Sequence, residues 1–116
     1  MDEKVLTVGE KVHVITRRLF AEDLRRHFVG KIVAVTNHLI RVEGYAFVFH
    51  AGLNEYRKRP NMRTRIFSLT DAENIVNVIP EGVEIESLQY EFVNQRLVVT
   101  DQAGFSLDIN EFGPTA

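Results

Sequence analysis

The most regular pattern of apolar and polar residues lies between Gly30 and Phe49, in the stretch GKIVAVTNHLIRVEGYAFVF. Its first part, from Lys31 to Val35, is rich in β-branched residues and ends at the turn residues Thr36 and Asn37. Apolar residues then resume and continue to Phe49. This pattern predicts two strands joined by a tight turn, and the rest of the chain is expected to be built around them.

The second of these strands is expected to be long and bent. Successive side chains of a strand point to opposite faces, so one parity forms a continuous core face, made of Ile40, Val42, Ala46 and Val48. The other parity changes from charged to aromatic at Tyr45. This change predicts that the second half of the strand is covered on both faces, with Gly44 where a bend is easiest.

Further strands are predicted on both sides of this pair. The β-branched run from Lys11 to Thr16 favours a first strand, and the segments from Thr64 to Leu69 and from Ile75 to Ile79 favour a fourth and a fifth. Three short alternating segments separated by turn residues follow, and they predict an antiparallel meander: Glu86 to Val93, Arg96 to Asp101 and Phe105 to Asn110.

Two connections have their own character. In the segment after the first strand, Phe20, Leu24 and Phe28 recur every four residues, and acidic residues precede basic ones. This arrangement predicts a short helix from Phe20 to Phe28, ended by Gly30. The polar, basic segment from His50 to Arg63 is expected to be a long loop that is either functional or mobile.

Five strands and one short helix within about 70 residues close more easily into a small barrel than they stack as a sandwich. We therefore expect a mainly β protein, with a small Sm-like or SH3-like barrel over residues 11–80 and an acidic β-meander extension over residues 81–116. With 116 residues, of which 45% are hydrophobic, the chain is expected to form a single domain.

Charge divides the chain in two. Through Pro80 there are 13 Lys and Arg against 9 Asp and Glu, whereas from Glu81 onward one Arg faces 7 acidic residues. The basic part could meet a polyanion, or it could pair with the acidic part of the same or a neighbouring chain. Without cysteine, a disulfide framework and thiolate metal sites are excluded. The acidic start resembles no signal peptide, and no apolar run approaches the ~20 residues that span a bilayer, so we expect a cytoplasmic protein without membrane contact.

The run from Gly30 to Val42 (GKIVAVTNHLIRV) resembles the first conserved motif of Sm-like proteins, in which a glycine opens the second strand and a turn leads into the third. The segment from Phe67 to Val78, with Asn74-Ile75-Val76, is similar to the second motif of that family, whose Asn-Ile/Val-Val begins the fifth strand. The resemblance covers about residues 11–80 and implies an Sm-like barrel, with the predicted helix inserted before the second strand.

The chain departs from this family where its members bind nucleotides. In the family, an aspartate and an asparagine of the turn join an Arg-Gly pair of the second motif around the base. Here Thr36 and Ile40 occupy the first two positions, and residues 70–73 (TDAE) stand in place of the pair. Only His38 occupies a pocket-lining position with a ring that can stack on a base. These departures put uridine binding in question, and the usual N-terminal helix of the family is also missing.

The densest cluster of positive charge is the candidate nucleic-acid site. It consists of Arg57, Lys58, Arg59, Arg63 and Arg65, with the neighbouring Tyr56 and with His38 as aromatic partners. Such a cluster could neutralise phosphates while a ring stacks on a base. The alternative is a solvated loop, or one paired with the acidic meander. A second basic group, Arg17, Arg18, Arg25 and Arg26, is interpreted as the solvated surface of the predicted helix.

No motif points to catalysis or to a cofactor. The histidines at positions 13, 27, 38 and 50 lie on separate predicted elements without the spacing of a zinc site. Neither a nucleophile elbow nor a glycine-rich phosphate loop is present in the sequence. We therefore expect a protein that is not an enzyme and that needs neither a metal nor a cofactor.

Three functions remain open. The first is a protein-interaction or assembly module, in which barrels join edge to edge with copies of themselves or with another protein. The second, ranked slightly lower, is an RNA-binding module that uses the basic loop and the predicted helix. The third, ranked well below both, is a small enzyme or ligand binder with His38 or His50 at the mouth of a pocket between barrel and meander.

Overall fold

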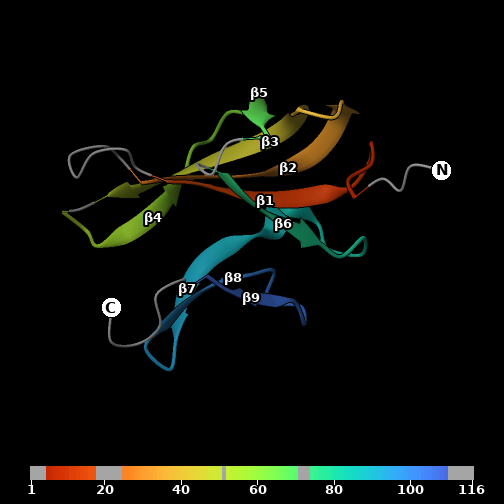
Figure 1. Cartoon of the computed structure of the whole chain (residues 1–116). Coiled ribbons are helices and arrows are strands. Elements are labelled where there is room, and N and C mark those ends of the chain that lie inside the picture. Colours follow the sequence, from red (N-terminus) through yellow and green to blue (C-terminus); the bar gives the residue numbers. More distant parts are fainter. Residues whose placement is uncertain (1–4, 18–24, 51, 71–73, 110–116) are drawn as a thin grey trace. The chain divides into compact units, whose positions relative to one another are not determined.

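The computed structural model describes residues 5–17, 25–50, 52–70 and 74–109 (Figure 1). The described residues are mainly β and belong to two compact units, Met1–Glu81 and Gly82–Ala116. Each unit has its own antiparallel sheet. None of the described elements is a helix long and apolar enough to cross a membrane.

The first unit contains six strands: β1 Lys11–Thr16, β2 Arg26–Val35, β3 Leu39–His50, β4 Glu55–Lys58, β5 Arg63–Ser68 and β6 Asn74–Ile79. They form one sheet in the order β4-β3-β2-β1-β6, and β5 also pairs with β3. The prediction of a central strand pair is confirmed, as is the strand of residues 11–16. The predicted fourth and fifth strands correspond, within one residue at each end, to β5 and β6.

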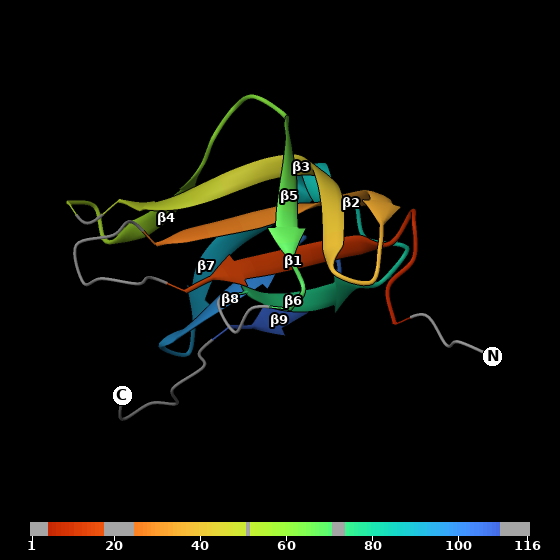
Figure 2. The same cartoon turned by 45° about the horizontal axis from the view of Figure 1, so that its top comes forward.

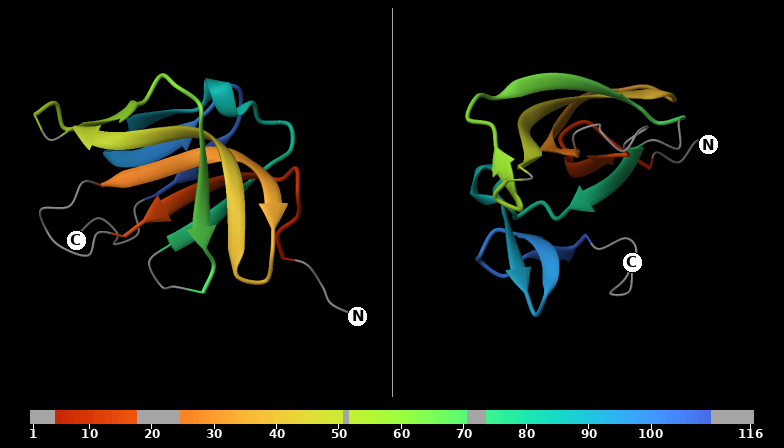
Figure 3. Two further views of the ribbon diagram at one scale, coloured as in Figure 1. Left: turned by 90° about the horizontal axis from the view of Figure 1, so that it is seen from above. Right: turned by 90° about the vertical axis from the view of Figure 1, so that its left-hand side faces the viewer.

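Strand β3 is long and bent, as predicted, and it divides one edge between two partners. Its first half, Leu39–Gly44, pairs with β5, and its last residues, Phe47–His50, pair with β4. Figure 3 shows the bend of this long strand, drawn in yellow. Gly44, in the middle of β3, lies opposite Gly30 of β2. A Cβ atom on Gly44 would lie 1.9 Å from the backbone oxygen of Val29, so the close approach of β2 and β3 requires glycine here.

The inner face of the bent sheet carries the core of this unit. The core cluster consists of Val12, Val14, Phe28, Ile32, Ile40, Val42 and Ala46. The predicted core face of β3 is therefore confirmed for its buried members, and Val48 is half-buried. Phe47 on the opposite face is only 2% exposed, which confirms that the second half of β3 is covered on both sides.

The predicted helix from Phe20 to Phe28 is wrong where the structure can test it. Arg26–Phe28 belongs to β2, whose residues pair with both β1 and β3, while residues 20–24 lie outside the described residues. Gly30 accordingly lies inside β2 and ends no helix. The predicted loop from His50 to Arg63 also contains a strand, β4, which completes the edge of β3 that β5 leaves open.

The sheet curls over its inner face, and β5 passes across that face (Figure 2). Within the described residues no ladder of backbone hydrogen bonds joins β5 to β6, so the sheet is not closed by strand pairing. A side-chain contact joins the two strands instead, because Asn74 Nδ2 donates a hydrogen bond to the backbone oxygen of Ser68 at 3.0 Å.

The second unit contains the predicted three-stranded meander: β7 Gln89–Val93, β8 Arg96–Thr100 and β9 Ser106–Asp108, preceded by the short 3₁₀ helix η1, Ile85–Ser87. Asn94 and Gln95, which join β7 to β8, both have positive φ, the requirement of the tightest hairpin turns. In the next turn, Asp101 Oδ1 accepts hydrogen bonds from the backbone N–H groups of Ala103 at 2.8 Å and Phe105 at 3.0 Å, which lower the pKa of this carboxyl.

Candidate functional site

The inner face of the first unit changes from apolar to cationic along β5. Phe67, Arg65 and Arg63 lie opposite Ile40, Val42 and Gly44 of β3. Directly opposed residues of antiparallel strands share a face, so the two arginines occupy the side of the sheet on which the core lies. Ile66, between Arg65 and Phe67 in the sequence, is 57% exposed. Two of the three inward positions of β5 are therefore cationic while an apolar residue is exposed, a departure from the usual pattern that is expected at functional sites.

Two further arginines join this face from other elements. Arg26 lies two residues before Phe28 on β2 and opposite Val48 on β3, so all three share the inner face. Arg59 follows β4, and its backbone N–H donates a hydrogen bond to the oxygen of Ala46 at 2.8 Å. The four arginines thus come from β2, from β5 and from the residue that follows β4, and only Arg26 is distant in the sequence from the other three.

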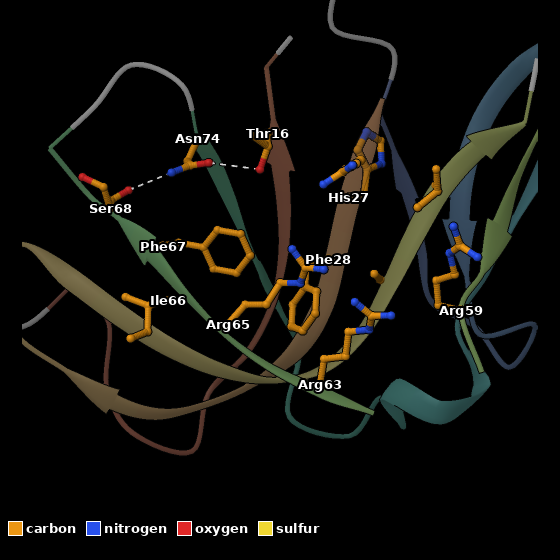
Figure 4. Close-up of a pocket in the computed structure, with 13 residues that line it drawn as sticks. Thr16, His27, Phe28, Arg59, Arg63, Arg65, Ile66, Phe67, Ser68 and Asn74 are labelled. Carbon is orange, nitrogen blue, oxygen red and sulfur yellow. Dashed lines mark hydrogen bonds between the residues drawn. The ribbon is translucent and has the colours of Figure 1, made fainter. Parts of the chain in front are cut away.

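These arginines line a hollow of about 440 Å³, which we call the arginine hollow. Its lining residues are Thr16, Arg26, His27, Phe28, Ala46, Val48, Arg59, Arg63, Arg65, Ile66, Phe67, Ser68 and Asn74 (Figure 4). None of these described lining residues is acidic. The volume lies in the range of small-molecule sites, about 300–1,000 Å³.

A short chain of neutral polar groups forms one side of the hollow. Asn74 bridges the two strands beside it: its amide nitrogen donates to the backbone oxygen of Ser68, and Thr16 Oγ1 donates to Asn74 Oδ1 at 3.1 Å. In Figure 4 this chain lies across the hollow from Arg63 and Arg59. A ligand between the two sides would meet hydrogen-bonding groups on one and guanidinium groups on the other.

Among the residues that the structure describes, no carboxylate neutralises the charge of the hollow. Within the described ranges, none of the four arginines pairs with a carboxylate, and the ion pairs lie elsewhere, between Arg57 and Glu55 and between Arg96 and Asp108. Arg65 is half-buried, with Cζ 5.9 Å from the centre of the Phe28 ring. Burial, followed by the charges of Arg63 and Arg26, lowers the pKa of Arg65, although a guanidinium remains protonated at neutral pH.

Three of the seven predicted nucleic-acid-binding residues, Arg59, Arg63 and Arg65, lie together in the arginine hollow. The other four lie outside its lining. Arg57 pairs with Glu55 at 3.2 Å, and the Nζ atom of Lys58 lies 4.1 Å from the centre of the Tyr45 ring.

Neither of the two predicted aromatic partners is itself a lining residue, although Tyr56 contacts one, His27. Tyr56 is stacked on His27, with the ring centres 4.6 Å apart. His38 is exposed in the turn between β2 and β3, where Thr36 Oγ1 accepts hydrogen bonds from the backbone N–H groups of His38 and Leu39.

The predicted site lacked Arg26 and the neutral partners Thr16, Ser68 and Asn74. The sequence pattern places Arg26 on the surface of a predicted helix, whereas the structure has β2 there. Its parity with Phe28 would have placed it on the core face if this segment had been interpreted as a strand. No local signal in the sequence joins Asn74 to Thr16, because 58 positions separate them.

The fold also brings together two histidines that the sequence separates. The rings of His13 and His27 meet edge to face at 5.2 Å, and Asn77 Nδ2 donates a hydrogen bond to His13 Nδ1 at 3.2 Å. Burial, followed by the charge of His27, lowers the pKa of His13 to about 3. Burial, followed by the charge of Arg25, lowers that of His27 to about 4. Both rings are therefore neutral at pH 7. The described residues contain no group of three side chains suited to a metal ion.

The arginine hollow combines four arginines that pair with no carboxylate of the described residues with a half-buried phenyl ring, Phe67, and with neutral donors and acceptors. This combination suits a phosphate-bearing ligand with a planar apolar part. Comparison of the chain with protein-family profiles, curated proteins and solved structures finds no match.

Proposed function

We propose that the first unit is a non-enzymatic binding module for single-stranded RNA and that the arginine hollow is its contact site. The observation that carries this proposal is the set of four arginines that converge from separate elements without a carboxylate partner in the described residues. Phosphate contacts supply most of the affinity of sequence-tolerant nucleic-acid binding, and arginine forms bidentate hydrogen bonds with phosphate. The exposed guanidinium groups of Arg59 and Arg63 would contact the backbone first.

We also propose that this unit is an open variant of an Sm-like barrel. Strand β1 pairs with both β2 and β6, so the segments that resemble the two motifs meet at one strand. The proposed RNA contact differs from the nucleotide pocket of that family, because His38 lies in the turn between β2 and β3, outside the hollow.

The RNA proposal can be tested by fluorescence anisotropy with a labelled single-stranded RNA of mixed sequence. We expect binding at low salt and a linear fall of log K with log salt, with a slope of about −0.7 per neutralised phosphate. Replacing Arg59 and Arg63 together with glutamine should weaken binding by at least tenfold and make the slope shallower.

The matched control is Arg41→Gln. Arg41 is exposed on the opposite face of β3, and its substitution removes one positive charge, half of what the double variant removes, without touching the hollow. Its effect should stay within about twofold. The absence of binding at low salt, or equal losses in the two variants, would exclude RNA binding through the hollow.

A second candidate function is self-assembly with further copies of the chain through strand edges. Within the described residues, β5 pairs only with β3 and β6 only with β1, so each strand has an edge without a backbone partner. Ile66 on β5 is 57% exposed and Val78 on β6 is 54% exposed. Strand edges flanked by apolar side chains are templates for pairing with another strand.

Light scattering after size-exclusion chromatography tests this candidate at tens of micromolar protein. We expect a mass above that of one chain, and Val78→Lys should reduce it to the monomer. A monomeric mass for the unmodified chain would rule out self-assembly at this concentration.

A further inference from the structure

The density of charge in the arginine hollow exceeds what an internal segment of RNA requires. Each internal phosphodiester carries one negative charge, and successive phosphates along an extended strand are separated by a whole nucleotide. Four guanidinium groups line a single hollow of about 440 Å³, and burial and the neighbouring charges of Arg63 and Arg26 lower the pKa of Arg65. A ligand with more than one negative charge at a single point fits this arrangement better than a diester.

The volume of the hollow also favours a single terminal group over an internal segment of RNA. A volume of about 440 Å³ holds one nucleotide but not several. The chain of hydrogen bonds from Ser68 through Asn74 to Thr16 joins β5, β6 and β1 on the side opposite Arg63 and Arg59 (Figure 4). An RNA strand that passed straight through the hollow would need to break these hydrogen bonds, whereas an RNA strand that ends in the hollow would not.

We propose that the hollow receives the phosphorylated end of an RNA strand, that is, a terminal phosphomonoester with the nucleoside that carries it. A monoester has a charge of −1.5 to −2 at neutral pH and three acceptor oxygens, about twice the charge of an internal phosphate. Arg26, Arg63 and Arg59 surround the monoester, and the half-buried Phe67 and the Arg65 guanidinium offer flat surfaces to the base. This assignment rests on the proposed RNA binding and adds the part of the strand that is recognised.

The experiment compares one 12-nucleotide RNA with a 5′-phosphate, a 3′-phosphate or hydroxyl groups at both ends, each as a competitor against the labelled strand. We expect one of the phosphorylated forms to bind at least tenfold more tightly than the hydroxyl form. Arg63→Gln should remove most of this preference, whereas Arg41→Gln should lower the affinity for all three forms equally.

The free nucleoside monophosphate of the terminal base, phosphorylated at the same position as the preferred strand, and inorganic phosphate are competed in the same assay. Both should compete at least tenfold more weakly than the phosphorylated strand, because they lack the following phosphates. If the nucleotide competes as well as the strand, the hollow is a site for free nucleotides and the assignment to strand ends is wrong.

The two proposals fail in distinguishable ways. No binding of any RNA at low salt contradicts the proposed function, whereas equal binding of phosphorylated and hydroxyl forms contradicts only the terminal-phosphate assignment. Circular dichroism checks the fold of each variant. Should Arg63→Gln fail to fold, Arg59→Gln at an exposed position replaces it, and retention of the full preference by that variant would overturn the assignment.

Discussion

At the residue scale, Gly30 and Gly44 fix how closely β2 and β3 approach. They lie opposite each other, and a Cβ atom on either would come within 2.4 Å or less of a backbone oxygen of the neighbouring strand. Backbone atoms cannot withdraw as a flexible side chain can, so the strands would have to separate. The bend of β3, and with it the orientation of β5, therefore requires glycine at both positions.

We expect Gly44→Ala to lower the free energy of unfolding by about 2–4 kcal/mol, because the added methyl group overpacks the strand pair. Urea denaturation followed by circular dichroism measures the change. Gly82→Ala is the matched control, since a Cβ atom there meets nothing within 4 Å, and its effect should stay within about 0.5 kcal/mol. Equal effects of the two substitutions would contradict the close approach.

The buried pair of His13 and His27 predicts acid sensitivity. The folded protein holds the pKa values at about 3 and about 4, below the ordinary 6.5, so the unfolded chain binds these protons first. The stability that the two neutral histidines contribute is fully present above pH 6.5, and it is lost as the pH falls toward their pKa values in the folded protein. Each histidine contributes up to about 1.4 kcal/mol per pH unit.

We therefore expect the free energy of unfolding to be roughly 2–4 kcal/mol lower at pH 5 than at pH 7. Thermal or urea denaturation at the two pH values tests this. His27→Phe keeps a ring stacked on Tyr56 and should reduce the difference, whereas His38→Gln in the exposed turn should leave it unchanged. A difference that persists in full in His27→Phe would contradict a role for the pair.

At the element scale, the hairpin of β7 and β8 depends on a turn that its residues adopt at a cost. Gln95 has φ 67°, in the left-handed region that glycine enters freely. Gln95→Gly should raise the stability of the hairpin by about 0.5–1 kcal/mol, and Gln95→Val should lower it. Amide hydrogen exchange of the β7–β8 ladder in the full chain measures both changes. Faster exchange in Gln95→Gly would contradict this assignment of the turn.

The strands that the sequence predicted are those with alternating apolar residues. β1, β3 and the meander follow this pattern closely. The start of β2 does not, because Phe20, Leu24 and Phe28 are spaced by four, and a spacing of four places residues on one face of a helix and also on one face of a strand. Pairing with β1 and β3 decides the outcome for Phe28, and no local pattern contains that information.

Strand β4 and part of the candidate site could not be predicted from sequence patterns either, because they too depend on pairing between distant segments. In EYRK only Tyr56 is apolar, so no alternation marks the strand, which forms because the end of β3 offers an unpaired edge. The sequence did predict Arg59, Arg63 and Arg65 as a cluster, because they are close along the chain. Arg26, Thr16 and Asn74 join them only through strand register.

At the scale of the whole molecule, the two units carry opposite charge. Residues 82–116 contain one arginine and six acidic residues, whereas the basic residues concentrate in the first unit. The acidic unit would repel RNA at low salt, and this repulsion fades beyond a Debye length of about 10 Å at 0.1 M salt. The net charge of −2 therefore gives no indication of the affinity of the arginine hollow.

We expect Glu84→Gln to raise RNA affinity by up to about twofold at low salt and not at all at 0.3 M salt, because the substitution reduces long-range repulsion. Glu84 is exposed. Fluorescence anisotropy at the two salt concentrations measures the effect. Weaker binding by this variant would contradict a repulsive role for the acidic unit.

One edge of β3 pairs with β4 and then with β5, so the connection between these two strands can change without changing the strand pairing of the fold. Between the two partner strands, residues 59–62 (RPNM) form the connection, and Arg59 and Arg63 stand at its two ends. Inserting or deleting residues there would change the span between two cationic side chains while every ladder of the sheet keeps its register. Among descendants of this chain, the length of that short segment is where we expect the size of the accepted anion to evolve.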